Sequence, residues 1–470
     1  MRCTASKRGF SQYFKHEDLN RIRSFDLDFI LRFAFGIIRG EILRMPRYGV
    51  WSFHHDDLGK YRGGPPAFWE MYYGDRVTGA VLQRLTDRLD GGVVLRRGYV
   101  RTIKESYIQN RDQAFLSSAG WPAAVCRDIH RGNTAKLEAA PSSTSAPVYH
   151  DPRNWQTLRS LAQIGLARAK GKFDWYFRAE QWNVGIADVP ISAFLAADRP
   201  LSVRWFPKLT RNLFRADPFG ISDGPLTTVL VEEFDYRKGK GTIAAIRCGG
   251  SDQVEVLSPA LDLPFHLSYP YLVQWDGQVY CIPETCQVRE IGLYRAVHFP
   301  AKWEKVATLV EGVDAVDPTV FRHEGRWWLL CADGSVGARP LHAWYADHLA
   351  GPWRPHACNP LKGDVRSTRP GGTPFVHNGR LIRPTQDCSG GYGTAISLNH
   401  IRRLTPTEFE EEPIAVVTPM AKGPYPDGVH TLSAMGEKTL IDGKRMVFIP
   451  AVFWRNVAAT VKAFWSRLVT

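Results

Sequence analysis

A short turn motif recurs through the second half of the chain and restricts that half to repeated β-structure. Glutamate, aspartate or asparagine precedes glycine in four copies: Trp275-Asp276-Gly277, His323-Glu324-Gly325, His377-Asn378-Gly379 and Ile441-Asp442-Gly443. Such pairs accept positive φ angles and therefore suit the tight turn of a β-hairpin. The copies recur at intervals of roughly 50 residues, the length of one four-stranded blade of a β-propeller.

The segments around these turns repeat as well. An apolar strand precedes the turn, and a proline step opens such a strand in four places: Asp217-Pro218, Tyr269-Pro270, Asp317-Pro318 and Thr373-Pro374. A further strand follows the turn, and five such units fit into the available length. The strand from Trp182 to Ala187 would complete the last unit. We therefore expect a five-bladed β-propeller over residues 171–451.

The first 130 residues follow a different pattern. Apolar runs and helical spacing predict an alternation of elements: strands over 25–38, 49–53 and 77–85, and helices over 67–73 and 100–130. This alternation indicates an α/β unit over residues 1–130. Residues 131–170 contain the stretch AAPSSTSAP, which is typical of a linker. The expected fold class is multidomain, an α/β unit followed by an all-β unit.

The tail over residues 452–470 is predicted to be an amphipathic helix. Five apolar residues recur at helical spacing: Phe453, Val457, Val461, Phe464 and Leu468. Three basic residues lie beside them in the sequence. One interpretation is a helix packed against the propeller. The other is a basic helix in peripheral contact with a membrane.

The charge balance favours an anionic partner. Lysine and arginine number 60 against 47 acidic residues, a net charge of +13, which suits sugar phosphates, folates and anionic lipids. No run of five basic residues occurs, so nucleic acid is not expected as a partner. The eight cysteines form no CxxC pair, which argues against a metal site and against disulfides. Because neither an apolar leader nor an apolar spanning run occurs, we expect a cytoplasmic protein, with membrane association through the tail.

The stretch SFHHDDLGKYRGGPP, from Ser52 to Pro66, combines residue types that few structural needs explain. His54 ends a predicted strand, where α/β sheets place their ligand crevice. Asp90 precedes Gly91-Gly92, and a carboxylate can orient an imidazole that takes a proton from an attacking amine. The pattern favours an acid–base site, but it also fits a turn in which His54 and His55 are only polar residues.

This stretch and TGAVLQRLTDRLDGGVVL resemble the folate-dependent formyltransferases, which act on methionyl-tRNA, glycinamide ribonucleotide and amino sugars. The family pattern is Asn-x-His, a Ser-Leu-Leu-Pro loop, Tyr/Trp-Arg-Gly and later Asp-x-Gly. The resemblance implies that His54 and Asp90 are catalytic and that Ser52 stands where the family has asparagine. It also implies the cofactor 10-formyltetrahydrofolate, whose binding loop here has Asp-Asp-Leu-Gly in place of Ser-Leu-Leu-Pro. The residues expected to bind the cofactor are Asp57, Leu58, Arg62 and Gly63.

The same resemblance implies a Rossmann-like unit. The strand FDLDFILRFAFGII resembles the strand just before the family's catalytic motif, and it begins at Phe25. The family has several strands and helices ahead of that strand. We therefore expect a partial Rossmann-like unit, incomplete at its N-terminus.

Acidic residues recur where strands of the expected propeller begin or end, at Asp217, Glu284 and Asp317. Strands that converge on a propeller axis bring such residues around one funnel. Two carboxylates a few ångströms apart can perform glycoside chemistry. Each aspartate also fits a turn cap at the entry of its strand.

This half resembles the five-bladed propellers of arabinanases, xylosidases and invertases, and more closely the N-terminal propeller of plant glucosamine inositolphosphorylceramide transferases. The shared stretches include HLSYPYLVQWDGQVYCIPET and RPGGTPFVHNGRLIRPTQD. The glycosidase base and its pKa-tuning partner map to Asp217 and Asp317, whereas Arg369 stands near the position of the acid. The resemblance implies a funnel that binds an anionic or phosphorylated sugar through seven residues: Asp217, His266, Tyr269, Glu284, Asp317, Arg369 and Arg383.

Three functions remain open on these grounds. The first is formyl transfer from 10-formyltetrahydrofolate to an amino sugar in surface-glycan or glycolipid biosynthesis, with a propeller that binds glycan, sugar nucleotide or sugar phosphate. The second is a non-catalytic glycan-binding propeller with a degenerate formyltransferase remnant. The third is a propeller that acts as a glycoside hydrolase or glycosyltransferase through its acidic residues.

Overall fold

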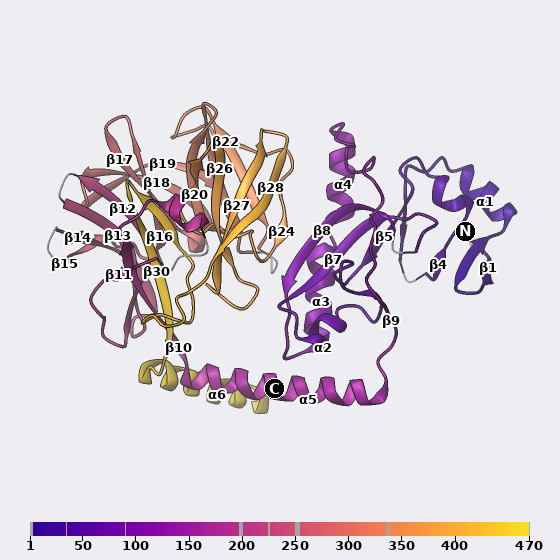
Figure 1. Cartoon of the computed structure of the whole chain (residues 1–470), viewed down its shortest axis with the longest axis horizontal. Coiled ribbons are helices and arrows are strands. Elements are labelled where there is room, and N and C mark those ends of the chain that lie inside the picture. Colours follow the sequence, from indigo (N-terminus) through magenta and orange to yellow (C-terminus); the bar gives the residue numbers. More distant parts are fainter. Residues whose placement is uncertain are drawn as a thin grey trace. The chain divides into compact units, whose positions relative to one another are not determined.

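The computed structural model describes seven stretches of the chain (Figure 1): residues 3–33, 35–89, 91–196, 201–223, 226–249, 254–335 and 339–469. The chain divides into two compact units, Met1–Arg168 and Ala169–Thr470. The boundary between them falls inside one long helix, α5 (Asn154–Phe177).

A small three-stranded sheet opens the first unit. It contains β1 (Ala5–Arg8), β2 (Ser11–Phe14) and β4 (Ile37–Ile38), and two helices accompany it, α1 (His16–Arg23) and the short η1 (Glu41–Arg44). Residues from α1, β4 and η1 share an apolar cluster with Val50 of the next strand. The N-terminal segment is therefore packed onto the strand that leads to His54.

The strand predicted over residues 25–38 is wrong in extent. Only β3 (Ile30–Arg32) and β4 are strands within it, and Phe25 and Phe33 are 62% and 65% exposed. The run is apolar, but its aromatic side chains remain in contact with solvent. Apolar composition alone therefore overestimated the strand.

The central sheet of the first unit includes the order β8-β7-β5-β3, with β5 (Val50–His54), β7 (Val77–Arg84) and β8 (Val93–Arg101). β3 and β5 are parallel, whereas β5, β7 and β8 are antiparallel neighbours. The strands predicted at 49–53 and 77–85 are present. The sheet is mixed, however, and does not have the wound parallel order of a Rossmann fold.

Three helices accompany this sheet where helices were predicted: α2 (Trp69–Tyr73), α3 (Tyr107–Ser118) and α4 (Trp121–His130). Trp51, Leu82 and Leu95 are each at most 1% exposed and form one apolar cluster with Val125 of α4. This cluster fixes β5, the strand that carries Ser52 and His54 to the site.

The segment predicted as a linker over residues 131–170 is only partly a linker. It contains β9 (Val148–Tyr149), which pairs with β6 (Arg62–Gly63), and most of α5. The sequence did not predict α5 because the helix has a single buried residue, Ser160. It therefore lacks the one-sided core pattern by which a packed helix is recognised.

The second unit contains five four-stranded antiparallel sheets. Four of them use strands in chain order: β12 (Leu213–Asp223), β13 (Leu226–Asp235), β14 (Lys240–Cys248) and β15 (Val254–Leu261); β16 (Ser268–Trp275), β17 (Gln278–Glu284), β18 (Glu290–His298) and β19 (Lys302–Glu311); β20 (Ala315–His323), β21 (Arg326–Asp333), β22 (Leu341–Ala346) and β23 (Arg354–Pro355); β25 (Phe375–His377), β26 (Arg380–Asp387), β27 (Ala395–Leu404) and β28 (Phe409–Val417). Short helices η2 (Ile191–Leu195) and η3 (Cys286–Val288) lie between strands.

The fifth sheet joins both ends of the unit. Its order is β11-β10-β30-β29, with β10 (Ala179–Ala187), β11 (Arg204–Trp205), β29 (Leu432–Met435) and β30 (Lys438–Val447). β10 and β30 pair along nine residues, from Ala179 opposite Val447 to Ala187 opposite Thr439. The prediction that Trp182–Ala187 completes the last sheet is therefore confirmed.

Apolar clusters connect these five sheets in a cycle. Each cluster contains residues from two successive sheets, as five pairs show: Val184 with Val229, Leu230 with Cys281, Ile282 with Val320, Trp328 with Leu381, and Ile382 with Leu432. The second unit is accordingly a sheet-rich, propeller-like fold.

Three of the four predicted hairpin turns are present, with positive φ angles at both central residues, as in Asp276 (50°) and Gly277 (68°). The fourth prediction, at Ile441-Asp442-Gly443, is wrong because these residues lie inside β30. The Asp442 carboxylate accepts hydrogen bonds from the backbone N–H groups of His430 and Thr431 instead of closing a turn. The neighbouring hairpin turns at Gly436, whose φ angle is 60°.

The predicted tail helix is α6 (Pro450–Val469). It packs against the end of α5 through hydrogen bonds from the Asn456 amide to the Trp175 carbonyl (2.6 Å) and between Tyr176 and Thr460 (2.9 Å). Within the described stretches, neither this helix nor any other is both long and apolar enough to span a bilayer.

Candidate functional site

A cavity of about 810 Å³ in the first unit contains the residues singled out in the sequence. Its wall includes Ser52 and His54 from β5, Arg32 from β3, and Gly63 from β6. The parallel pairing of β3 with β5 places Arg32 opposite Ser52. The cavity lies within the volume range of sites that hold small molecules and cofactors.

His54 is held by backbone and carboxyl groups. Its Nε2 lies 3.2 Å from the Tyr61 carbonyl oxygen and 3.8 Å from Asp56 Oδ2, and its side chain is 11% exposed. A neutral imidazole that donates from Nε2 to this carbonyl keeps Nδ1 as its basic nitrogen. The Tyr61 carbonyl and the Asp56 carboxyl thus orient the His54 ring.

Ser52 is buried, and its hydroxyl has a cationic neighbour. Arg32 Nη1 donates to Ser52 Oγ over 2.8 Å, and Arg32 Nη2 donates to the Phe35 carbonyl. Arg32 Nε is buried without a hydrogen-bond partner among the described residues. Burial lowers the pKa of Arg32 from its usual value, although a guanidinium remains protonated at neutral pH. The sequence did not single out Arg32, because only the β3–β5 pairing brings it to Ser52.

Asp56 and Glu70 form a buried carboxyl pair beside His54. They are 2% and 0% exposed, and burial followed by the charge of Glu70 raises the pKa of Asp56 to about 10. Asp56 Oδ1 accepts from the Ala67 N–H at 2.9 Å, and Glu70 Oε1 accepts from the Asp57 N–H at 2.9 Å. Burial also raises the pKa of Glu70. The pair therefore retains a proton at neutral pH.

His55, the second histidine of the motif, packs between rings. It contacts Phe53 and Phe115 with centroid distances of 5.4 and 4.3 Å, and its Nε2 lies 3.1 Å from Ser118 Oγ. Burial, followed by the neighbouring His54, lowers the pKa of His55 to about 4. His55 is therefore neutral at physiological pH and packs inside the unit.

The residues expected to bind the cofactor are used in different ways. Gly63 lines the cavity, and with φ at 90° its Cα lies so close to Tyr149 that a Cβ would meet the carbonyl at 2.1 Å. Asp57, Leu58 and Arg62 do not line it: Leu58 is 2% exposed, and its carbonyl accepts from the Thr144 hydroxyl at 2.8 Å. Asp90 lies outside the described residues.

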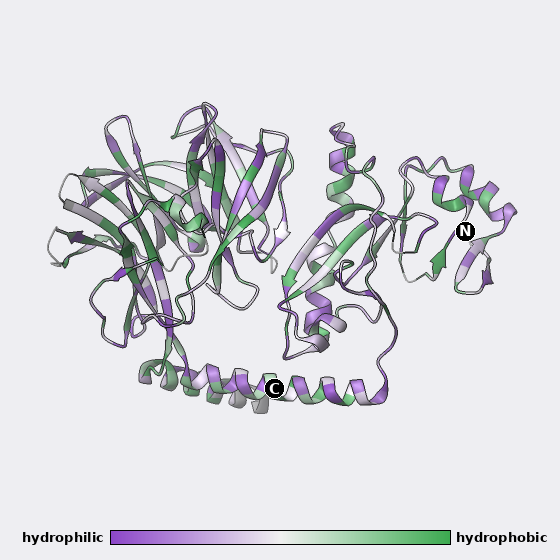
Figure 2. Ribbon diagram, in the orientation of Figure 1, coloured by the Kyte–Doolittle hydropathy of each residue, from purple (hydrophilic) through white to green (hydrophobic). Residues whose placement is uncertain are grey.

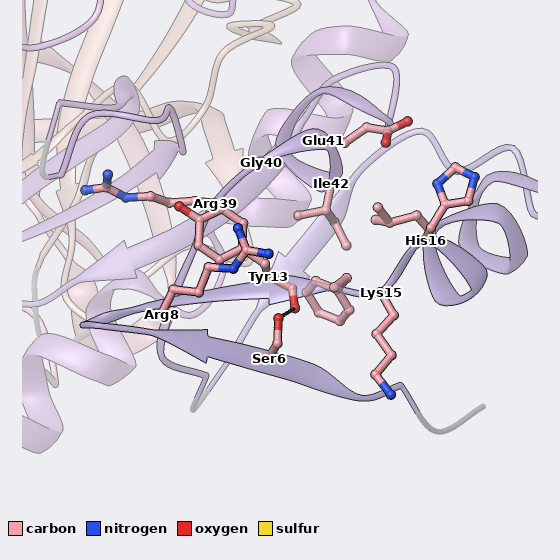
Figure 3. A pocket seen from close by; sticks show the side chains of 11 residues that line it. Ser6, Arg8, Tyr13, Lys15, His16, Arg39, Gly40, Glu41 and Ile42 are labelled. Atoms are coloured by element: carbon pink, nitrogen blue, oxygen red, sulfur yellow. Dashed lines mark hydrogen bonds between the residues drawn. The ribbon is translucent and has the colours of Figure 1, made fainter.

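A second cavity of about 400 Å³ lies beside the N-terminal hairpin (Figure 3). Basic side chains dominate its wall, with one carboxylate among them: Arg8, Lys15, His16, Arg39 and Glu41. Arg39 also lines the larger cavity. This cavity was not predictable from the sequence because its residues come from four elements, β1, β2, α1 and η1.

In the second unit the predicted acids come together. Tyr269 N–H donates to Asp217 Oδ2 at 3.3 Å, and Asp317 N–H donates to Glu284 Oε2 at 2.9 Å. Burial raises the pKa of Asp217 to about 6 and, together with the charge of Asp317, the pKa of Glu284 to about 8. Burial and the charge of Asp217 also raise the pKa of Glu232, an acid that the sequence reading missed.

Strand bulges place these residues. Asp217, Tyr269 and Asp317 have φ angles of 51°, 46° and 52°, and the strand register shifts at each of them. A bulge residue leaves the ladder of hydrogen bonds and can redirect its side chain. Three successive sheets therefore present one side chain each at an equivalent position.

Arg369 forms an ion pair with Asp317. Its Nε and Nη2 both donate to the Asp317 carboxylate, the second at 3.2 Å, and Gln386 donates to the same carboxylate at 2.8 Å. The Arg369 guanidinium also lies over the Tyr392 ring at 4.8 Å. Among the described residues its Nη1 makes no hydrogen bond.

Two other residues predicted to bind substrate, Tyr269 and His266, form hydrogen bonds or close contacts within the protein. The Tyr269 hydroxyl accepts from the Gly372 N–H at 2.8 Å and is fully buried. His266 Nδ1 accepts from the Gly241 N–H at 2.9 Å, while its Nε2 lies 3.6 Å from Glu232. These residues thus hold neighbouring loops together at the same place as the acids.

The prediction that Arg383 binds substrate is corrected by the structure. Its side chain is 0% exposed and donates twice to Glu411, at 3.0 and 2.7 Å, and once to the Ser367 carbonyl. A buried bidentate ion pair of this kind serves packing of the sheet. The sequence could not distinguish it from Arg369 because Glu411 lies on a different strand.

A buried group of Asp217, His430 and Asp442 completes the constellation and was missed in the sequence. His430 Nδ1 lies 2.6 Å from Asp442 Oδ2, and His430 Nε2 lies 3.4 Å from Asp217 Oδ1. Their ligand atoms lie within 4.8 Å of one another, a donor set that could hold a metal ion. Thr431 also donates to Asp217 Oδ1 at 2.7 Å.

Two family profiles match the chain. Residues 3–119 match the profile described as formyl transferase, and residues 207–425 match that described as glucosamine inositolphosphorylceramide transferase 1, N-terminal. The chain is therefore similar to formyltransferases in one segment and to the plant transferase in another.

Curated relatives of two kinds align with parts of the chain. Glucosamine inositolphosphorylceramide transferase 1 is 34% identical over 208 residues in Oryza sativa subsp. japonica and 35% identical over 205 residues in Arabidopsis thaliana, covering 43% and 42% of this chain. The matches span 28% and 27% of those plant proteins, little more than a quarter of their length. Methionyl-tRNA formyltransferase of Halalkalibacterium halodurans is 24% identical over 234 residues, which is 49% of this chain and 67% of that protein.

Among solved structures, a thermostable family-43 glycoside hydrolase aligns with 44% of this chain and 77% of its own length, at 14% identity and a TM-score of 0.34. A Bacillus subtilis arabinanase aligns with 49% of this chain and 93% of its own, at 13% identity and a TM-score of 0.35.

The buried carboxyl pair predicts a pH dependence of stability. In the unfolded chain Asp56 titrates near 3.8, whereas in the folded unit burial raises its pKa to about 10. The folded state therefore holds a proton that the unfolded chain releases, and the free energy of unfolding falls as the pH rises between these values. Asp56→Asn keeps an oxygen for the Ala67 N–H and an N–H group for Glu70 without needing that proton.

We expect Asp56→Asn to reduce this decline. Hydrogen exchange of the β5 and β7 amides, compared at about pH 6 and about pH 9 after correction for intrinsic exchange, measures it. The control Asp112→Asn, whose side chain is 47% exposed, should retain the wild-type pH dependence. Equal pH dependence in Asp56→Asn and wild type would contradict the shared proton.

Proposed function

We propose that the first unit transfers a formyl group from 10-formyltetrahydrofolate to the amine of an amino sugar, within surface-glycan or glycolipid biosynthesis. The observation that carries this proposal is that His54, Ser52 and Arg32 line one cavity of about 810 Å³. The match of residues 3–119 to the formyl transferase profile supports the reaction class.

The size and lining of the cavity fit the cofactor. Its volume suits a group of that size, and Gly63 and Gly64 present backbone on its wall. Asp57, Leu58 and Arg62 do not line it, so in this chain Gly63 and Gly64 would hold the cofactor in their place. When bound, 10-formyltetrahydrofolate supplies an activated formyl group.

The chain's own residues then divide the remaining chemistry. His54 would take the proton that the acceptor amine loses as its nitrogen bonds to the formyl carbon, and would return it to the donor nitrogen from which that carbon departs. Ser52 and Arg32 donate to the formyl oxygen as negative charge develops on it. Because Arg32 Nη1 lies 2.8 Å from Ser52 Oγ, the guanidinium can supply the donor that the family's asparagine would supply at position 52.

We further propose that the five sheets of the second unit form a five-bladed propeller that binds the glycan or sugar-phosphate partner. Arg369, with its Nη1 available, would hold an anionic group beside Asp317. The relatives of this segment are named for a transfer to inositolphosphorylceramide, which contains a sugar-like phosphate ester. Glycoside hydrolysis is less favoured, because Arg369 pairs with one of the acids that it would need.

We predict that purified protein formylates an amino sugar and that His54→Ala loses this activity by on the order of a hundredfold or more, since the amine then has no proton acceptor. The assay incubates 10-formyltetrahydrofolate with a panel of amino sugars and amino-sugar nucleotides and detects the N-formyl product by mass spectrometry. His16→Ala, which alters the other cavity of the unit, serves as the control. Full activity of His54→Ala, or no product from any acceptor, would contradict the proposal.

A second prediction concerns Arg32. Arg32→Ala should lower kcat by on the order of a hundredfold with little change in KM, because its donor acts on charge that develops during the reaction. The double variant Arg32→Ala/Ser52→Asn should recover part of that loss, since the smaller residue 32 leaves room for an asparagine amide. A loss confined to KM, or no recovery in the double variant, would assign Arg32 to substrate anchoring instead.

A third prediction tests the second unit. Arg369→Ala should abolish binding to phosphorylated or uronic-acid glycans on an array, whereas Arg369→Lys should retain part of it because the positive charge remains. Arg380→Ala, at an exposed position of β26, is the control. Circular dichroism verifies that the variants are folded, and unchanged glycan binding by folded Arg369→Ala would remove the proposed binding site.

A further inference from the structure

Helix α6 presents an apolar stripe to solvent. Trp454, Ala458, Val461 and Trp465 follow one another at steps of four, three and four residues, which places them on one face of the helix. Trp454, Val461 and Trp465 are 66%, 49% and 62% exposed. This stripe is separate from the face through which the helix packs.

The packed face of α6 is already satisfied. Val452 and Asn456 are buried, and Phe453 contacts Phe177 and Tyr176 of α5 at centroid distances of 5.6 and 6.3 Å. Trp454 is 66% exposed, so most of its surface lies outside this packed face.

Helix α5 has a stripe of the same kind. Six apolar residues recur at steps of three and four, and all are exposed: Trp155, Leu158, Ala162, Leu166, Ala169 and Phe173. Leu158 and Leu166 are 68% and 72% exposed. Figure 2 shows hydrophobic and hydrophilic residues alternating along both helices. An apolar stripe that runs the length of a 24-residue helix is rare on a surface that only water touches.

The charges of the two helices have one sign. Within the length of the stripe, α6 contains two basic residues, Arg455 and Lys462. Each of them directly follows a stripe residue in the sequence. The helix contains no acidic residue. α5 contains four basic residues and one acidic residue, Asp174, which pairs with Lys170. Tryptophan and leucine beside lysine and arginine is the composition of helices that lie in the interface of an anionic bilayer.

This charge pattern distinguishes between occupants of the stripes. A second copy of the chain would bring α6 against α6 and place like charges side by side, which opposes pairing. A bilayer with anionic headgroups places opposite charges beside Arg455 and Lys462 while it covers the tryptophans.

We infer that α5 and α6 each dock at the interface of an anionic membrane, with their exposed stripes inserted at headgroup depth and their basic residues on the phosphates. The inference stands on exposure, spacing and charge alone and does not depend on formyl transfer.

Flotation of the full-length protein with vesicles tests the inference. We expect the protein to float with phosphatidylcholine vesicles that contain phosphatidylserine, and much less with phosphatidylcholine alone or at high salt. Trp454→Ser/Val461→Ser should lower the bound fraction on the order of tenfold, because it removes apolar area that the interface covers. Arg455→Gln/Lys462→Gln should lower binding on the order of tenfold with anionic vesicles only.

Val376→Ser provides the matched control, since this valine is 63% exposed on β25 and lies on neither helix. It should float like wild type. Sedimentation velocity without vesicles identifies the competing occupant. The proposal of membrane docking would be contradicted by a dimer that Trp454→Ser/Val461→Ser converts to a monomer. Equal flotation of all variants would also contradict it.

Discussion

The second unit depends on one strand pairing between its two ends. β10 and β30 lie side by side along nine residues, and Lys444 reaches Glu180, 264 positions away, at 3.0 Å. Four of the five sheets use strands that follow one another in sequence, so each can form from a local segment. The fifth requires that the chain return to its starting point. Until it does, the apolar surfaces of the first and fourth sheets that face this sheet are uncovered, and the buried group of Asp217, His430 and Asp442 is not assembled.

Sequence reasoning succeeded where local chemistry decides the structure. The turns at Asp276, Glu324 and Asn378 were predictable because positive φ angles at paired residues need only the turn itself. The same reasoning failed at Asp442, whose carboxylate binds backbone groups contributed by a distant segment. In the site, His54 and Ser52 were identified from one stretch, whereas Arg32 and Glu70 required the pairing of strands and the packing of α2. Helix α5 escaped prediction because it buries almost nothing.

The two units handle buried acids in different ways. In the first unit Asp56 and Glu70 share a proton, so the acid beside His54 is neutral and the nearby cation is Arg32. In the second unit the Asp317 carboxylate accepts hydrogen bonds from Arg369 and Gln386, while burial raises the pKa of Glu284 to about 8. A neutral acid beside a base suits proton transfer, whereas fixed ion pairs around a cluster suit the recognition of a charged ligand. This contrast supports different roles for the two units.

The bulges at Asp217, Tyr269 and Asp317 have a consequence for how such a unit can change. Each of these residues sits outside the hydrogen-bond ladder of its strand, so its identity does not alter which neighbours face the core. Aspartate occupies two of the positions and tyrosine the third, with nearly the same backbone angles. Equivalent slots in successive sheets can therefore exchange an acid for a neutral side chain by single substitutions. A binding protein and an enzyme could share this framework and differ at only a few such slots.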